Sequence, residues 1–87
     1  MHIETLTREV ECTFRDYAIE QIPARIEWLE SFVAGKIKNL SDYKMRLESG
    51  KKMQRHQLIA IKQYPLSIAE TQLVIRAIKE AYAYRTA

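Results

Sequence analysis

The chain has 87 residues with one cysteine, two glycines and two prolines, and its formal net charge is +3 at pH 7. A single cysteine excludes an intramolecular disulfide, and two isolated glycines exclude a glycine-rich phosphate-binding loop. So few turn-forming residues also disfavour a β-rich fold, and no apolar run is long enough to cross a membrane.

The first predicted helix covers residues 3–17. Apolar side chains recur there at spacings of three and four, as helical periodicity requires, and they are Ile3, Leu6, Val10, Phe14 and Tyr17. Residues 5–14 could instead form a strand, because Val10, Cys12 and Phe14 alternate with polar residues. Arg8 breaks that alternation and no other segment alternates, so the pattern favours a helix.

A second helix is predicted from Pro23 to Ala34, because proline suits the first helical turn and Gly35 suits a C-terminal cap. If the helix continued, Lys36 would fall on its apolar side, so we expect it to end near Gly35. Its inner stripe consists of Ile22, Ile26, Leu29 and Val33. Trp28 and Phe32 flank this stripe and suit either the core or a protein interface.

A third helix is predicted from Ser41, as N-cap, to Pro65. Gly50 marks a kink, a close contact or a break into two shorter helices. Basic residues form a row on this segment, interrupted by Glu48, and they are Lys44, Lys51, Lys52, Arg55 and Lys62. Such a row suits phosphates or an acidic partner, although a solvated face with Glu48 pairing to neighbouring lysines is the simpler interpretation.

The fourth predicted helix starts with a capping box, Ser67 to Glu70, directly after Pro65, and runs to about Tyr84. Its apolar arc covers more than half of the circumference, which indicates burial on two sides. Because a tight turn at Pro65 would leave one apolar side uncovered, we expect a homodimer through this helix. Leu73, at the edge of the arc, should yield a monomer when replaced by glutamate.

No cluster of residues indicates catalysis, a metal or a cofactor. His2 and His56 are isolated, and the neighbours of Cys12 are acidic residues, which do not activate a thiol. Charge is unevenly distributed instead: residues 1–35 carry three basic and seven acidic side chains, whereas residues 36–62 carry eight basic and two acidic ones.

The sequence therefore predicts an all-α, single-domain protein, a compact bundle of three or four helices with short connections. We expect a cytoplasmic, non-enzymatic binding protein (an adaptor, inhibitor or modulator) that docks a helical surface onto a protein partner. The candidate interface residues are Trp28, Phe32, Leu73 and Tyr84. The alternative is a small nucleic-acid-binding regulator that uses the basic row.

Overall fold

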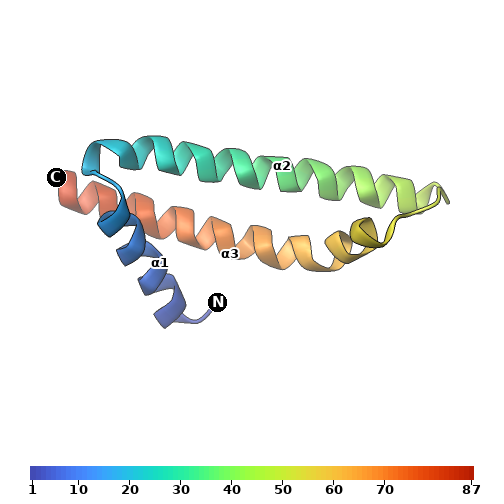
Figure 1. The fold of residues 1–87 in the computed structure, drawn as a ribbon, viewed down its shortest axis with the longest axis horizontal. Helices are drawn as coiled ribbons and strands as arrows, with labels where there is room; N and C mark the ends of the chain where they lie inside the picture. The colour runs from blue at the N-terminus through green and yellow to red at the C-terminus, as the bar shows by residue number, and fades with distance from the viewer.

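The computed structural model describes residues 1–87, and all of its secondary structure is helical, which confirms the all-α prediction. It contains α1 (Ile3–Asp16), a 3₁₀ turn (Ile19–Gln21), α2 (Ile22–Glu48) and α3 (Arg55–Thr86). The helices α2 and α3 form a long antiparallel hairpin, and α1 lies against α3 (Figure 1). There are thus three helices in an elongated shape of 52 × 24 × 18 Å. No helix combines the length and the apolar character that crossing a membrane requires.

The helix α1 settles the choice between helix and strand for residues 5–14 in favour of the helix. Its apolar side chains Leu6, Val10 and Phe14 pack against the core as the spacing predicts. Thr13 is buried on the same helix, and its hydroxyl donates to the carbonyl of Glu9 at 2.9 Å. A buried hydroxyl is therefore satisfied within one helical turn.

The helix α2 continues past Gly35 to Glu48, so the predicted end near Gly35 is wrong. Ser41, the predicted N-cap of a third helix, lies inside α2. Lys36 does face α3, as the helical phase requires, but its ammonium group donates to the hydroxyl of Ser67 at 2.6 Å. The aliphatic stem of Lys36 can pack against α3 while its ammonium group remains hydrogen-bonded to Ser67. A lysine on this face of α2 is therefore compatible with a continuous helix.

The break between the two long helices falls at Gly50, one of the three roles predicted for that residue. Gly50 has a φ of +72°, in the left-handed region that favours glycine. The helix α2 ends two residues before it, and α3 begins at Arg55 after Gln54, whose backbone N–H donates to the side chain of Gln57.

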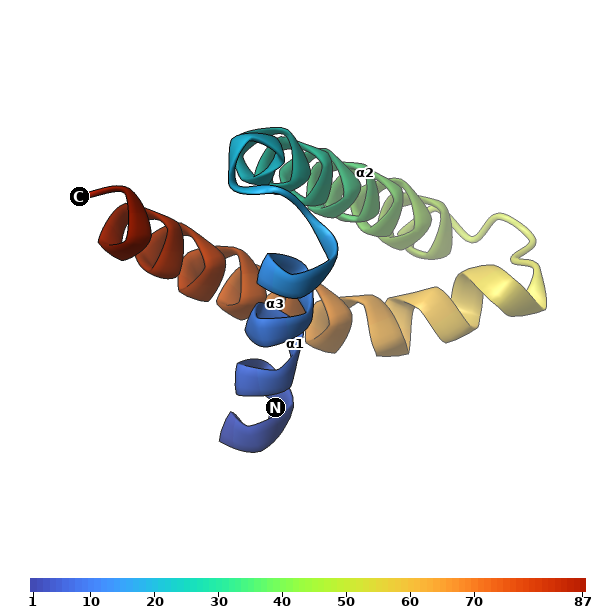
Figure 2. The same ribbon diagram turned by 60° about the vertical axis from the view of Figure 1, so that its left-hand side comes forward.

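Pro65 lies inside α3, so the predicted stop at this residue and the new start at Ser67 are both wrong. Proline removes one backbone hydrogen bond and bends a helix, and α3 bends along its first half (Figure 2). The hydroxyl of Ser67 accepts from Lys36 and caps no helix. Packing against α2 thus keeps α3 helical at Pro65, where one backbone hydrogen bond is missing.

The core occupies the end of the hairpin that carries α1. The buried cluster comes from α2 and the C-terminal half of α3, and consists of Ile22, Ile26, Leu29, Val33, Val74, Ile75 and Ile78. An ion pair of 3.0 Å between Lys79 and Glu30 also joins the two helices at this end. Because α1 and α2 both pack on α3, this part of α3 is the middle helix. The predicted tight turn at Pro65, on which the expectation of an uncovered apolar side rested, is absent because Pro65 lies inside α3.

Candidate protein-interaction surface

A row of aromatic and cationic side chains follows one flank of α2, and we refer to it as the aromatic–cation ladder. Four members lie on α2 at spacings of three or four residues, one follows α1 and one lies on α3. The ladder consists of Tyr17, Arg25, Trp28, Phe32, Lys36 and Tyr64.

Trp28 and Phe32 form the centre of the ladder. Their rings are stacked with centroids 5.6 Å apart and planes only 10° from parallel. The spacing of four residues predicts this stacking, and the structure confirms it. Both residues remain largely in solvent, with 55% of Trp28 and 43% of Phe32 exposed. They therefore border the core and present apolar rings to the outside.

Arg25 lies between two rings in the N-terminal part of the ladder. Its guanidinium lies 4.5 Å from the Trp28 ring centroid and 5.3 Å from that of Tyr17. Its Nε atom is buried and has no hydrogen-bond acceptor, and Arg25 belongs to no ion pair. An open pocket of about 570 Å³ adjoins it and is lined by Tyr17, Glu20, Gln21, Ala24, Arg25 and Trp28. The arrangement places a cation between two aromatic rings, beside an open pocket with polar and apolar lining residues.

Lys36 is the last member of the ladder on α2 and links the ladder to α3. Its Nζ lies 4.6 Å from the centroid of Phe32 and 5.2 Å from that of Tyr64, and it donates to Ser67. No carboxylate pairs with it. Lysine thus holds Phe32 in place while its charge stays available at the edge of the surface.

The four residues predicted as a protein interface divide between two surfaces. Trp28 and Phe32 belong to the ladder on α2. Leu73 and Tyr84 are exposed on the side of α3 that faces away from the buried Ile78. Trp28 and Phe32 therefore lie together on one surface, and Leu73 and Tyr84 lie apart from it on another helix.

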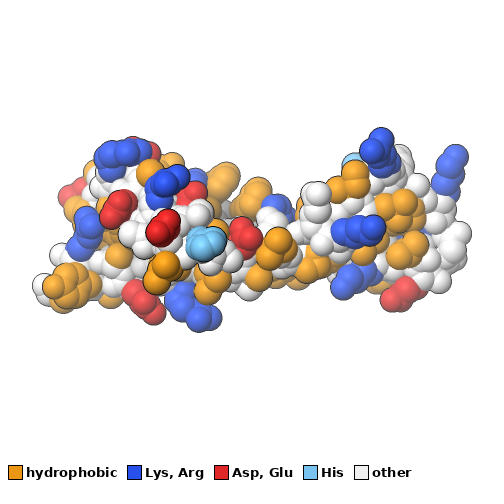
Figure 3. Space-filling view, turned by 90° about the horizontal axis from the view of Figure 1, so that it is seen from below, with side chains coloured by type: hydrophobic (Ala, Val, Ile, Leu, Met, Phe, Trp, Pro, Cys, Tyr) orange, Lys and Arg blue, Asp and Glu red, His pale blue; other side chains and the backbone are white.

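The predicted basic row does not lie on one helix. Lys44 is on α2, Lys51 and Lys52 are in the turn, and Arg55 and Lys62 are on α3. They thus lie near the end of α2, in the turn and on the first turns of α3, and Lys and Arg side chains are frequent at this end of the molecule (Figure 3, right-hand end). The chain contains two ion pairs, Arg15–Asp16 and Lys79–Glu30, so the expected pairing of Glu48 with lysines does not occur.

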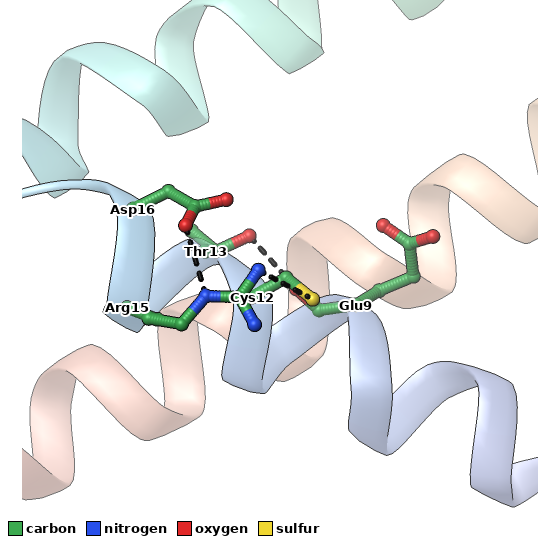
Figure 4. Close-up of polar contacts among 5 residues, drawn as sticks. All are labelled: Glu9, Cys12, Thr13, Arg15 and Asp16. Carbon is green, nitrogen blue, oxygen red and sulfur yellow. Dashed lines mark hydrogen bonds and ion pairs between the residues drawn. The ribbon is translucent and has the colours of Figure 1, made fainter.

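Cys12 lies in a small polar cluster on α1 (Figure 4). The guanidinium of Arg15 donates to Cys12 Sγ at 3.5 Å and to Asp16 Oδ1 at 3.0 Å. The hydrogen bond to Asp16 raises the pKa of Arg15 above its ordinary value. The thiol is partly buried and free. No group of three or more His, Cys, Asp or Glu side chains is placed to hold a metal ion.

Comparison with known proteins gives no relative: no family model, no curated protein and no solved structure matches this chain.

Sequence reasoning found two of the four aromatic members of the ladder, Trp28 and Phe32, and missed the other four residues. The spacings Arg25–Trp28 and Phe32–Lys36 place each cation next to a ring on one helix face, and this signal is visible in the sequence. Tyr17 and Tyr64 come from other segments, so only the tertiary structure brings them into the ladder.

Proposed function

We propose that this chain is a small, non-enzymatic, cytoplasmic binding protein whose aromatic–cation ladder docks onto a protein partner. The observation that carries the proposal is the exposed Trp28–Phe32 stack, held between Arg25 and Lys36. Large rings already fixed in position lose little conformational freedom on binding.

The composition of the ladder favours a protein as the ligand. Tryptophan, tyrosine and arginine are the residue types most enriched among binding hot spots, where they fill apolar pockets on the partner. Arg25 and Lys36 have no carboxylate partner within the chain. A partner surface that carries carboxylates beside apolar side chains therefore complements the ladder in both charge and polarity.

The test begins by capturing partners from the source organism on immobilised wild-type protein, with chemical cross-linking and nuclease treatment, and then purifying the captured protein. We expect Trp28→Ala and Phe32→Ala each to weaken its binding at least tenfold, because truncating a hot-spot aromatic removes its packing. Isothermal titration calorimetry with the purified partner measures the change.

Tyr84→Ala is the matched control, because this exposed aromatic lies on α3 outside the ladder. It should bind as the wild type does. If Trp28→Ala and Phe32→Ala retain full affinity while remaining folded, the ladder is not the interface.

A second candidate function is binding of nucleic acid at the hairpin tip. It is favoured by one observation: none of the six basic residues between positions 44 and 62 belongs to an ion pair. Such free cations can release counterions from phosphates, so binding should weaken with added salt.

A gel shift at low salt tests this second candidate. Lys51→Glu with Lys52→Glu should abolish the shift, whereas Arg8→Glu with Arg76→Glu, which changes the net charge equally, should leave it. If the wild type shifts no DNA or RNA at low salt, this function is excluded.

A further inference from the structure

The outward face of α3 carries three exposed apolar residues at intervals of seven. They are Ile59, Leu66 and Leu73, which are 41%, 63% and 42% exposed. At about 100° per residue they lie within about 40° of one another around the helix. Hydrophobic side chains line the narrow stretch between the end that carries α1 and the tip (Figure 3). A repeat of seven is the spacing at which one helix packs along another.

This line lies outside the faces of α3 that the chain itself covers. The α2 side of α3 is marked by buried Ile75 and Ile78. On the α1 side, Met1 and Glu9 share a pocket with Glu70 and Val74 of α3. The Leu66 direction is about 80° from Val74 around the helix. No part of the same chain therefore covers the apolar line.

Charges on the same face change sign at Leu66. Arg55 and Lys62 precede it; Glu80 and Glu70, which stands at the border with the α1 side, follow it. All four lie within about 40° of the Leu66 direction, and none belongs to an ion pair. Lys62 comes four residues before Leu66 and Glu70 four residues after it. The charges on this face are thus complementary to those on a second copy of the same face that runs in the opposite direction.

We infer that a second copy of this chain covers the face in antiparallel orientation, with Leu66 on the two-fold axis. Ile59 of each chain then packs against Leu73 of the other. The basic half of each face lies along the acidic half of its partner. A parallel pairing would align Arg55 and Lys62 with their own copies, and like charges repel.

The distribution of charge over the whole chain supports the same orientation. Residues 36–62, a segment that includes the tip, carry eight basic and two acidic side chains, whereas residues 1–35 carry seven acidic and three basic ones. Because α1 packs on the C-terminal half of α3, an antiparallel partner brings its basic tip beside the acidic end. This interface lies on α3 and stands independently of partner binding by the ladder on α2.

The first measurement is the mass in solution. Sedimentation equilibrium at micromolar concentration should report about twice the 10.2 kDa chain mass for the wild type. Leu66→Glu should sediment as a monomer with an unchanged far-UV circular dichroism spectrum. Met45→Glu is the matched control, because Met45 is 62% exposed on α2 and should leave the dimer intact. A monomeric wild type, or a dimeric Leu66→Glu, would overturn the inference.

The second measurement tests orientation with a short bismaleimide, in a Cys12→Ser background. Leu66→Cys should cross-link to its own copy, because both positions lie at the axis. Leu73→Cys should not, since its two copies would be about 21 Å apart along the helices. A mixture of Ile59→Cys and Leu73→Cys chains should give the mixed cross-linked product. Cross-linking of Leu73→Cys with itself, without cross-linking of Leu66→Cys, would overturn the antiparallel arrangement.

Discussion

Lys36 joins α2 to α3 beyond the apolar core through its contacts with Phe32, Tyr64 and Ser67. Lys36→Ala should lower the free energy of unfolding by about 1–2 kcal/mol, because it removes one charged hydrogen bond and two ring contacts. Urea denaturation at fixed protein concentration measures this. The control Lys38→Ala, at an exposed position on α2, should change stability by less than about 0.5 kcal/mol. Equal effects of the two substitutions would mean that Lys36 contributes nothing specific.

The two glycines should respond in opposite directions to the same substitution. Gly50→Ala should destabilise the protein by about 1 kcal/mol, because its φ of +72° strains any residue with a Cβ atom. Gly35→Ala should stabilise it by about 0.5–1 kcal/mol, because alanine is the better helix former and a Cβ there meets no atom within 4 Å. Thermal denaturation of both variants checks this, and a destabilising Gly35→Ala would place the end of α2 back at Gly35.

At the scale of the helix, the continuity of α3 through Pro65 has a measurable cost. Proline in a helix interior is about 3 kcal/mol less favourable than alanine, and the ring of Pro65 is exposed, so it packs little. Pro65→Ala should therefore raise the free energy of unfolding, by about 1–3 kcal/mol after relaxation of the bend. Guanidinium denaturation followed by circular dichroism measures it. Lower stability in this variant would show that Pro65 ends one helix and starts another.

Interior helix patterns were predictable from local spacing, and helix ends were not. The stripe Ile22, Ile26, Leu29 and Val33 is the buried face of α2, as the spacing of three and four predicts. Ser41 and Ser67 match the preferences of N-caps, yet both lie inside helices. Cap preferences are worth about 1 kcal/mol each, which is less than the packing of a long helix against its neighbour contributes.

At the scale of the molecule, burial is concentrated at one end of a long hairpin. Seven of the eight buried apolar residues form the core near α1, and Ala60 is the remaining one. Amides of residues 40–48 should therefore exchange with solvent faster than those of residues 24–34 in the same helix. Hydrogen-exchange mass spectrometry measures this difference, and uniform protection along α2 would contradict it.

The candidate site was predictable only where one helix supplies it. Trp28 and Phe32 stand out by type and spacing, and their stacking needs no other element. Arg25 and Lys36 complete the ladder through contacts with Tyr17 and Tyr64, which are distant in sequence. The basic residues near the tip lie on two helices and the turn because the chain reverses at Gly50, whereas the sequence predicted a row on one segment, with a kink, a close contact or a break open at Gly50.

The sequence by itself determined that the chain is helical and, for the stripe of α2 from Ile22 to Val33, which side chains face inward, because both follow from contacts three or four residues apart. Only the tertiary structure decided where the helices end, since Lys36 finds Ser67 and two rings across the hairpin. Tertiary packing also decided that the C-terminal half of α3 lies between α1 and α2. Contacts between distant segments outweigh local cap and proline signals. The free energy gained by burying apolar surface between two long helices exceeds the free energy that a single helix cap contributes.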